Sequence, residues 1–290
     1  MNSDLQTGSI ESPTEAQRLA LLKLLADEDS KIVEAVHRKL LSYGPSVISW
    51  LKPHSLSADA VLRRNVRGVI QHFMRKEADA VFMEFCETQG EDLDLERGLG
   101  LLALTQYPEA SLEALGAQLD QIAAEVRVRT LRVIAPQQRL LLLNQHVFAE
   151  QGFHGNPDYE SDVENCFFNR VIERRTGNPI GLCSIYLLLC RRLILPVTGV
   201  GLPGHFLCRF QSPTMEVFID CFNGGRFLTK ADCIQHLHQT NHGLDEGYLA
   251  PVNTRRILMR VCANIQQTHL HHNELDSAER VKRYLVTLAS

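Results

Sequence analysis

The stretch that decides the fold runs from residue 177 to residue 225 and reads GNPIGLCSIYLLLCRRLILPVTGVGLPGHFLCRFQSPTMEVFIDCFNGG. It begins with an apolar segment that carries Cys183 and continues with shorter segments that contain His205 and Asp220. A thiol, an imidazole and a carboxylate therefore follow one another in the order that nucleophilic cysteine chemistry uses. Whether these groups can act together depends on where the fold places the thiol.

The apolar segment is predicted to be a buried helix. Asn178 is a favourable N-cap, and Pro179 suits the first helical position, where proline loses no hydrogen bond. Apolar residues then occur on nearly every side of the helix as far as about Arg192. This pattern is typical of a helix in the middle of a domain.

After this helix the hydrophobic pattern changes to a period of two, which indicates strands. Glycine and proline separate the strands, and Asn223, Gly224 and Gly225 are expected to form a turn. The predicted strands cover residues 197–200, 205–210 and 215–219. The expected fold class is therefore α+β, with a small antiparallel sheet packed on the central Cys183 helix.

The rest of the chain is predicted to be helical on both sides of this core. Residues 1–13 are polar and expected to be disordered, and residues 14–132 show apolar residues at helical spacing. Within that region residues 27–51 resemble one HEAT-type hairpin, and the C-terminal residues resemble one tetratricopeptide-like hairpin. The predicted division is a tail (1–13), a helical HEAT-like region (14–132), the core (133–250) and a helical hairpin (251–290).

Composition and charge narrow the functional classes. A hydrophobic content of 44% and a charged content of 22% are ordinary for a globular protein. The formal net charge is -4 and no segment concentrates Lys and Arg, which predicts no nucleic-acid partner. The N-terminus has no apolar signal region, and no apolar run is long enough to span a bilayer. We therefore expect a cytoplasmic protein without a membrane partner.

Cysteine and histidine positions give little support for a metal site. None of the eight cysteines has C-x-x-C spacing, and most lie in apolar runs, so buried free thiols are expected. Two histidine clusters, at residues 236–242 and 269–272, lack the cysteine or carboxylate that would complete a ligand set. No cofactor and no metal are therefore predicted.

Several motifs resemble those of the bacterial SirB-type proteins, a family with a transglutaminase-like core. They are N-x-x-x-N-x-V-x-x-R-R-x-G-x-P-I from Asn165, G-x-P-G-H-F from Gly201, and I-D-x-F-N-G-G from Ile219. The resemblance covers most of the chain, including its helical N-terminal part and its C-terminal hairpin. It implies a transglutaminase-like (papain-like) core, and it implies a fold more than an activity.

The wider transglutaminase-like superfamily supplies a test for the nucleophile. Its active members place Gly-x-Cys at the start of the central helix and Gly-Ile-Pro at its end. Here residues 194–196 resemble that end without the glycine, and counting back places Pro179 at the nucleophile position. Cys183 lies one helical turn further along, which corresponds to about 5.4 Å.

The candidate catalytic residues are therefore Cys183, His205 and Asp220, and each has two interpretations. Cys183 is either a small core residue that packs on the sheet or the thiol of a displaced triad. A thiol must come within about 3 Å of its base, although helical side chains lean toward the N-terminus and recover part of the gap. His205 and Asp220 are either a structural pair that links two strands or the remnant of a ligand-binding site.

Two functional hypotheses follow. The favoured one is a non-catalytic protein-interaction or regulatory protein, a possible pseudoenzyme, because Pro179 stands where a cysteine is expected. The alternative is a cysteine peptidase or amidase-like hydrolase, or an acyltransferase, that uses Cys183, His205 and Asp220. The expected partner is another protein, and the oligomeric state is left open.

Overall fold

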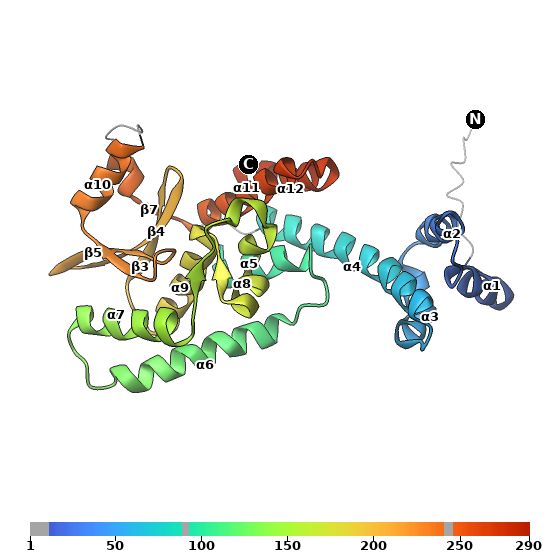
Figure 1. Cartoon of the computed structure of the whole chain (residues 1–290), viewed down its shortest axis with the longest axis horizontal. Helices are drawn as coiled ribbons and strands as arrows, with labels where there is room; N and C mark the ends of the chain where they lie inside the picture. The colour runs from blue at the N-terminus through green and yellow to red at the C-terminus, as the bar shows by residue number, and fades with distance from the viewer. Residues whose placement is uncertain (1–11, 89–92, 241–245) are drawn as a thin grey trace, which may run out of the picture. The chain divides into compact units, whose positions relative to one another are not determined.

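The computed structural model describes residues 12–88, 93–240 and 246–290 (Figure 1). The chain divides into two compact units, Met1–Asp79 and Ala80–Ser290. The helix α4, Ala60–Thr88, contains residues of both units. No helix in the described ranges combines the length and the apolar content that crossing a membrane requires.

The first unit is entirely helical in its described part, as the sequence predicts. Thr14 and Gln17 form a reciprocal capping box at the start of the first helix. Gly44 adopts a left-handed conformation (φ 78°) before Pro45, which separates the second helix from the next turn. The elements are α1 (Glu15–Leu25), α2 (Ser30–Ser42), η1 (Pro45–Val47), α3 (Ile48–Leu51), η2 (Lys52–Leu56) and the first part of α4. Their core consists of Leu22, Leu25, Val36, Leu40, Val47, Leu51, Val66, Val69 and Phe73.

The second unit contains the sheet and most of the helices. Its helices are α5 (Leu95–Leu104), α6 (Leu112–Thr130), α7 (Pro136–Asn144), α8 (Phe168–Arg174), α9 (Pro179–Arg192), α10 (Lys230–Gln239), α11 (Thr254–His271) and α12 (Leu275–Ala289). Shorter turns are η3 (Gln145–Glu150), η4 (Tyr159–Ser161), η5 (Val163–Cys166) and η6 (Glu246–Leu249). The helices α11 and α12 pack against each other, and both contribute to the core around α9.

The sheet is antiparallel, so the predicted α+β class with a small antiparallel sheet is confirmed. Its strand order is β6-β5-β4-β3-β7. The strands are β3 (Val197–Leu202), β4 (His205–Ser212), β5 (Met215–Asp220), β6 (Arg226–Leu228) and β7 (Pro251–Val252). A separate parallel pair, β1 (His154–Gly155) with β2 (Thr176–Gly177), was not among the predicted strands.

The helix α9 forms as predicted, from Pro179 to Arg192. The Asn178 side chain accepts a hydrogen bond from the Gly181 amide (2.8 Å), which caps the helix. Every residue from Pro179 to Cys190 is buried, and Figure 1 shows the helix beside the sheet and above α6. This burial fixes the start of α9 with respect to the strands that carry His205 and Asp220.

One helix that the sequence predicts is interrupted in the structure. Phe168 and Ile172 recur at helical spacing and predict a single helix over residues 162–175. The structure instead has η5 (Val163–Cys166) followed by α8 (Phe168–Arg174). Phe167 interrupts them with an extended backbone (φ -86°, ψ 125°), and its ring is buried against Tyr107. Tertiary packing of this ring therefore overrides the local helical pattern.

Candidate functional site

His205 and Asp220 lie at the adjacent ends of two neighbouring strands. His205 opens β4 and Asp220 closes β5. Their side chains are joined by a hydrogen bond of 3.0 Å between Nε2 and Oδ1. Only 15% of the His205 side chain and 8% of the Asp220 side chain are exposed. The structure therefore brings these two predicted site residues together.

The turn after β5 holds Asp220 in place. The Asn223 side chain donates to Oδ2 (2.8 Å) and its backbone amide donates to Oδ1 (3.3 Å). Gly225 ends this turn with φ 74°, and a Cβ atom there would lie 2.3 Å from the Phe148 ring, so only glycine fits. The predicted Asn-Gly-Gly turn thus orients the carboxylate.

The ionisation of the pair is set by the contacts between its members. Burial acts to lower the pKa of His205, but the hydrogen bond and charge of Asp220 outweigh it and leave that pKa above its usual value. Burial acts to raise the pKa of Asp220, but the bonds from His205 and Asn223 outweigh it and leave that pKa below its usual value. The pair therefore favours an imidazolium and a carboxylate.

Cys183 lies in the second turn of α9 and is fully buried. Its thiol donates to the carbonyl oxygen of Phe206 (3.4 Å). Within residues 12–88, 93–240 and 246–290 this thiol has no hydrogen bond to His205. Burial raises the pKa of Cys183 well above its usual value, which disfavours the nucleophilic thiolate.

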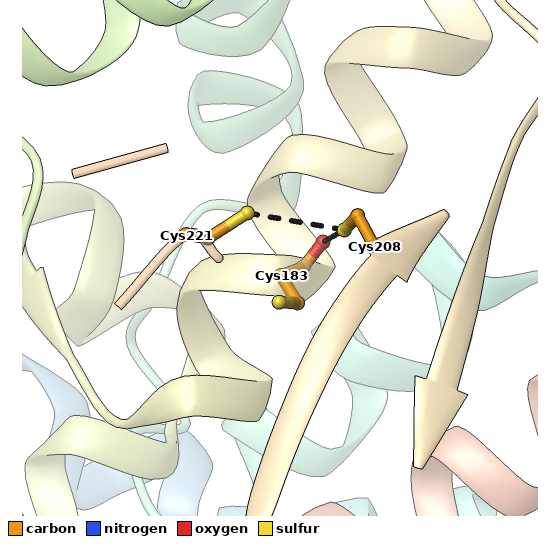
Figure 2. Close-up of side chains that lie close together, drawn as sticks. All are labelled: Cys183, Cys208 and Cys221. Atoms are coloured by element: carbon orange, nitrogen blue, oxygen red, sulfur yellow. Dashed lines mark hydrogen bonds between the residues drawn. The ribbon is translucent and has the colours of Figure 1, made fainter. Parts of the chain in front are cut away.

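Two further thiols, those of Cys208 and Cys221, lie close to Cys183, as Figure 2 shows. The Cys208 thiol donates to the Cys183 carbonyl oxygen (3.7 Å), and the Cys221 thiol donates to the Cys208 sulfur (3.8 Å). The three sulfurs lie within 4.8 Å of one another, close enough to share one soft metal ion. Each thiol hydrogen already has an acceptor, so hydrogen bonds among the thiols account for the arrangement. Burial acts to raise the pKa of Cys208, but the hydrogen bonds from Cys183 and Cys221 outweigh it and lower that pKa to about 7.

Strand alternation places the thiols and the imidazole on different faces of the sheet. Phe206, Cys208 and Phe210 of β4 belong to the core that contains α9, whereas Leu207 belongs to the core that contains α10. His205 precedes Leu207 by two residues and therefore shares its face, and its ring lies 6.1 Å from the ring of His236 on α10. The thiol cluster and the His205–Asp220 pair are thus separated by the sheet backbone.

The start of α9 lies beside the imidazole, and the residue there is Pro179. Pro179 and His205 together line two hollows, with cavity volumes of about 230 Å³ and about 500 Å³. Tyr159 and Gly204 also line both hollows. The position that faces His205 is therefore held by a residue without a nucleophilic atom.

Sequence reasoning missed some residues of this site. His236 and Arg260 line the two hollows from α10 and α11, although they lie more than 30 residues after His205 in the chain. The spacing of the histidines near residue 236 indicates only a possible role as metal ligands. Arg260 could have been found from the polar face of its helix, where Asn264 follows one turn later.

Comparison with known proteins is consistent with this geometry. The family model described as the transglutaminase-like superfamily matches residues 113–263, slightly more than half of the chain. This range includes α9, the strands that carry His205 and Asp220, and most of the residues around the hollows. The chain therefore belongs to the transglutaminase-like superfamily.

Curated relatives add bacterial and animal proteins. A UPF0162 protein of Xylella fastidiosa is 31% identical over 196 residues, which cover 66% of this chain and 70% of that protein. A UPF0162 protein of Pseudomonas aeruginosa is 32% identical over 140 residues, 46% of this chain and 51% of that protein. Human F-box only protein 21 is 28% identical over 203 residues, 57% of this chain and 31% of that protein. No solved structure matches.

Proposed function

We propose that this protein is a non-catalytic interaction or regulatory protein built on a transglutaminase-like core that has lost its nucleophile. The observation that supports it most is the occupant of the helix start, Pro179, beside an intact His205–Asp220 pair. The nearest thiol on α9, that of Cys183, is buried on the other face of the sheet and bonded to a backbone carbonyl. A nucleophile needs a base within hydrogen-bond reach.

The proposal also includes the cellular setting of the protein and its finer family relationships. We place the protein in the cytoplasm because its eight cysteines are free and buried, which suits a reducing compartment. We also retain the SirB-type relationship, the HEAT-like and tetratricopeptide-like descriptions of the flanking helices, and the four-part domain division as proposals. The partner we propose is another protein, and the net charge of -4 favours no nucleic acid.

Alkylation rates of individual cysteines test the loss of the nucleophile. The full chain is treated with iodoacetamide at neutral pH, and the modified sites are quantified by peptide mass spectrometry over time. We expect Cys183 to react as slowly as Cys208 and Cys221, with no change in His205→Ala. Rapid labelling of Cys183 that His205→Ala abolishes would overturn the proposal.

A second candidate function is a thiol hydrolase or acyltransferase that uses Cys183, His205 and Asp220. It is favoured by the His205–Asp220 hydrogen bond beside a solvent-accessible hollow, the arrangement by which a carboxylate orients a catalytic base. It requires α9 to expose Cys183 to this face. The same alkylation experiment separates the two candidates, because only the enzyme requires a reactive Cys183.

A further inference from the structure

The smaller hollow beside His205 has a polar wall on α11. Its remaining walls come from the start of α9, the start of β4 and the segment that contains Tyr159. His272, directly after α11, donates from Nε2 to the Ser161 carbonyl oxygen (2.7 Å) and so ties the Tyr159 segment to this helix. The hollow is therefore bounded by elements that are joined to one another.

Three side chains on one face of α11 line this hollow with hydrogen-bond donors. Arg260, Asn264 and Gln267 recur at intervals of four and three residues, which places them on one side of the helix. The side-chain amides of Asn264 and Gln267 form no hydrogen bond with any other described residue. Such a row offers N–H groups to a ligand that accepts hydrogen bonds.

The charge of Arg260 is not neutralised within the described part of the chain. Its one hydrogen bond there is a long one, 3.4 Å from Nη2 to the Leu202 carbonyl oxygen, and no carboxylate lies within ion-pair distance. Arg192 and Arg174, by contrast, are each paired with two carboxylates. The exposed carboxylate of Glu160 lines the same hollow without pairing with Arg260. A partly buried guanidinium next to a cavity is the group that recognises a carboxylate by two parallel hydrogen bonds.

The shape of the site favours a ligand longer than a single small anion. The hollow that contains Arg260 and the larger hollow beside α10 are adjacent, because they share four lining residues, Tyr159, Pro179, Gly204 and His205. Their volumes of about 230 Å³ and about 500 Å³ together are large enough for several residues of an extended chain. Tyr159 supplies an aromatic surface at the point where the two hollows meet.

We propose that this cleft binds an extended acidic segment of a partner protein, with an Asp or Glu carboxylate of that segment paired with Arg260. The remainder of the segment runs past Pro179 and His205 toward His236. This inference rests on the proposed interaction function and names the site and the chemistry of the partner.

Two peptide libraries provide the test. Both consist of acetylated, amidated nonapeptides with random flanking positions, and the central residue is fixed as Glu in one library and as Gln in the other. Retention is measured on the immobilised full-length protein. We expect the Glu library to be retained about tenfold more than the Gln library, which corresponds to about 1.4 kcal/mol, because only Glu can pair with the guanidinium of Arg260. Arg260→Gln should abolish this preference, and Arg260→Lys should keep part of it.

Arg256→Gln is the matched control, because Arg256 lies one turn earlier on α11 and lines a different hollow with Arg260. It should leave the preference for Glu intact, and thermal unfolding of each variant verifies folding. Equal retention of both libraries, or a preference that survives Arg260→Gln, would overturn the peptide site. Binding of free glutarate with no peptide retention would also overturn it and indicate a small-molecule site.

The outcome of this test is separable from the outcome for the missing nucleophile. Equal retention of the two libraries would contradict the acidic-peptide site. It would not change the expected slow alkylation of Cys183, on which the proposed loss of the nucleophile depends. Rapid alkylation of Cys183 would contradict the proposed non-catalytic function. The dependence of peptide retention on Arg260 would remain a separate result, because it does not involve Cys183.

Discussion

The two faces of the sheet are built from neighbouring residues of β4 and β5, yet they carry different chemistry. Phe206 and Cys208 face α9 in a dry core where three thiols lie close together. His205 and Asp220 face the other side, where the hollows begin and a hydrogen bond of 3.0 Å joins them. Both faces contribute packing, since Leu207 and Phe218 belong to the core beside α10, but only the second face carries the His205–Asp220 pair.

This comparison shows that a thiol, an imidazole and a carboxylate can be near one another in the fold without the thiol bonding to the imidazole. Side chains alternate between faces at every residue of a strand, so Cys208 and the Cys183 thiol beside it lie on the face opposite to His205. The only position of α9 that borders both hollows together with His205 in the described structure is Pro179. The presence of Cys, His and Asp in the sequence is therefore weaker evidence for activity than the face of the sheet on which each of these side chains lies.

The largest expected effect comes from removing the buried carboxylate. Asp220→Ala leaves the imidazole of His205 buried without its partner, and we expect the free energy of unfolding to fall by about 3 kcal/mol. Urea denaturation measures this loss. Asp232→Ala is the control, because that carboxylate accepts from the Thr229 amide in the capping box of α10 at an exposed site and should cost much less. Equal costs for the two variants would contradict a special role for the polar pair.

A smaller loss is expected on the thiol face. Cys183→Ala removes one buried atom and leaves a small cavity, so we expect about 1.5 kcal/mol of destabilisation. Urea denaturation at pH 5.5, where Cys183 and Cys208 both carry their protons, measures this cost. A cost close to zero would contradict the tight packing of Cys183 against the sheet.

Asn223→Ala tests the turn that holds the carboxylate. It removes the side-chain hydrogen bond to Asp220 but keeps the backbone one, and Asn223 is exposed, so we expect a cost of about 1 kcal/mol. The second expected result is a lower His205 pKa in NMR titrations, because a less firmly held carboxylate stabilises the imidazolium less well. An unchanged His205 titration would argue against this coupling.

The smallest effect is a change of stability with pH. The raised pKa of His205 means that its contribution is complete below the unfolded-state pKa of about 6.5 and is lost as the pH rises through the folded-state value. The lowered pKa of Asp220 means that its contribution is complete above about 3.9 and is lost as the pH falls through the folded-state value. The stability difference between the wild type and His205→Gln should therefore be largest near pH 5.5 and narrower at pH 8. A difference that widened toward pH 8 would contradict these assignments.

Much of the second unit was predictable from local sequence signals. The Asn178 cap, the all-round apolar pattern of α9 and the period of two in β3 to β5 each have a local physical cause, and the structure contains all of them. The turn from Asn223 to Gly225 was predictable for the same reason. These features depend on residues that are close together in the chain.

The features that were not predictable depend on distant segments. The short parallel pair of β1 and β2 forms between residues 154–155 and 176–177, and the break at Phe167 depends on the ring of Tyr107. The approach of Arg260 to the hollow beside His205 likewise requires the fold of α11 onto the core. The sequence spacing did place Cys183 one turn beyond the helix start, but only the strand register revealed which face it occupies.

The most direct test of the central claim restores a thiol at the position beside His205. In Pro179→Cys the introduced thiol lies at the start of α9, where the helix dipole and the nearby imidazole favour the thiolate. We expect it to react with iodoacetamide on the order of 100-fold faster than Cys183 at pH 7, and His205→Ala in the same background should remove most of that gain. If Cys183 instead reacts as fast as the introduced thiol, the thiol and the imidazole are not separated as described, and the claim is wrong.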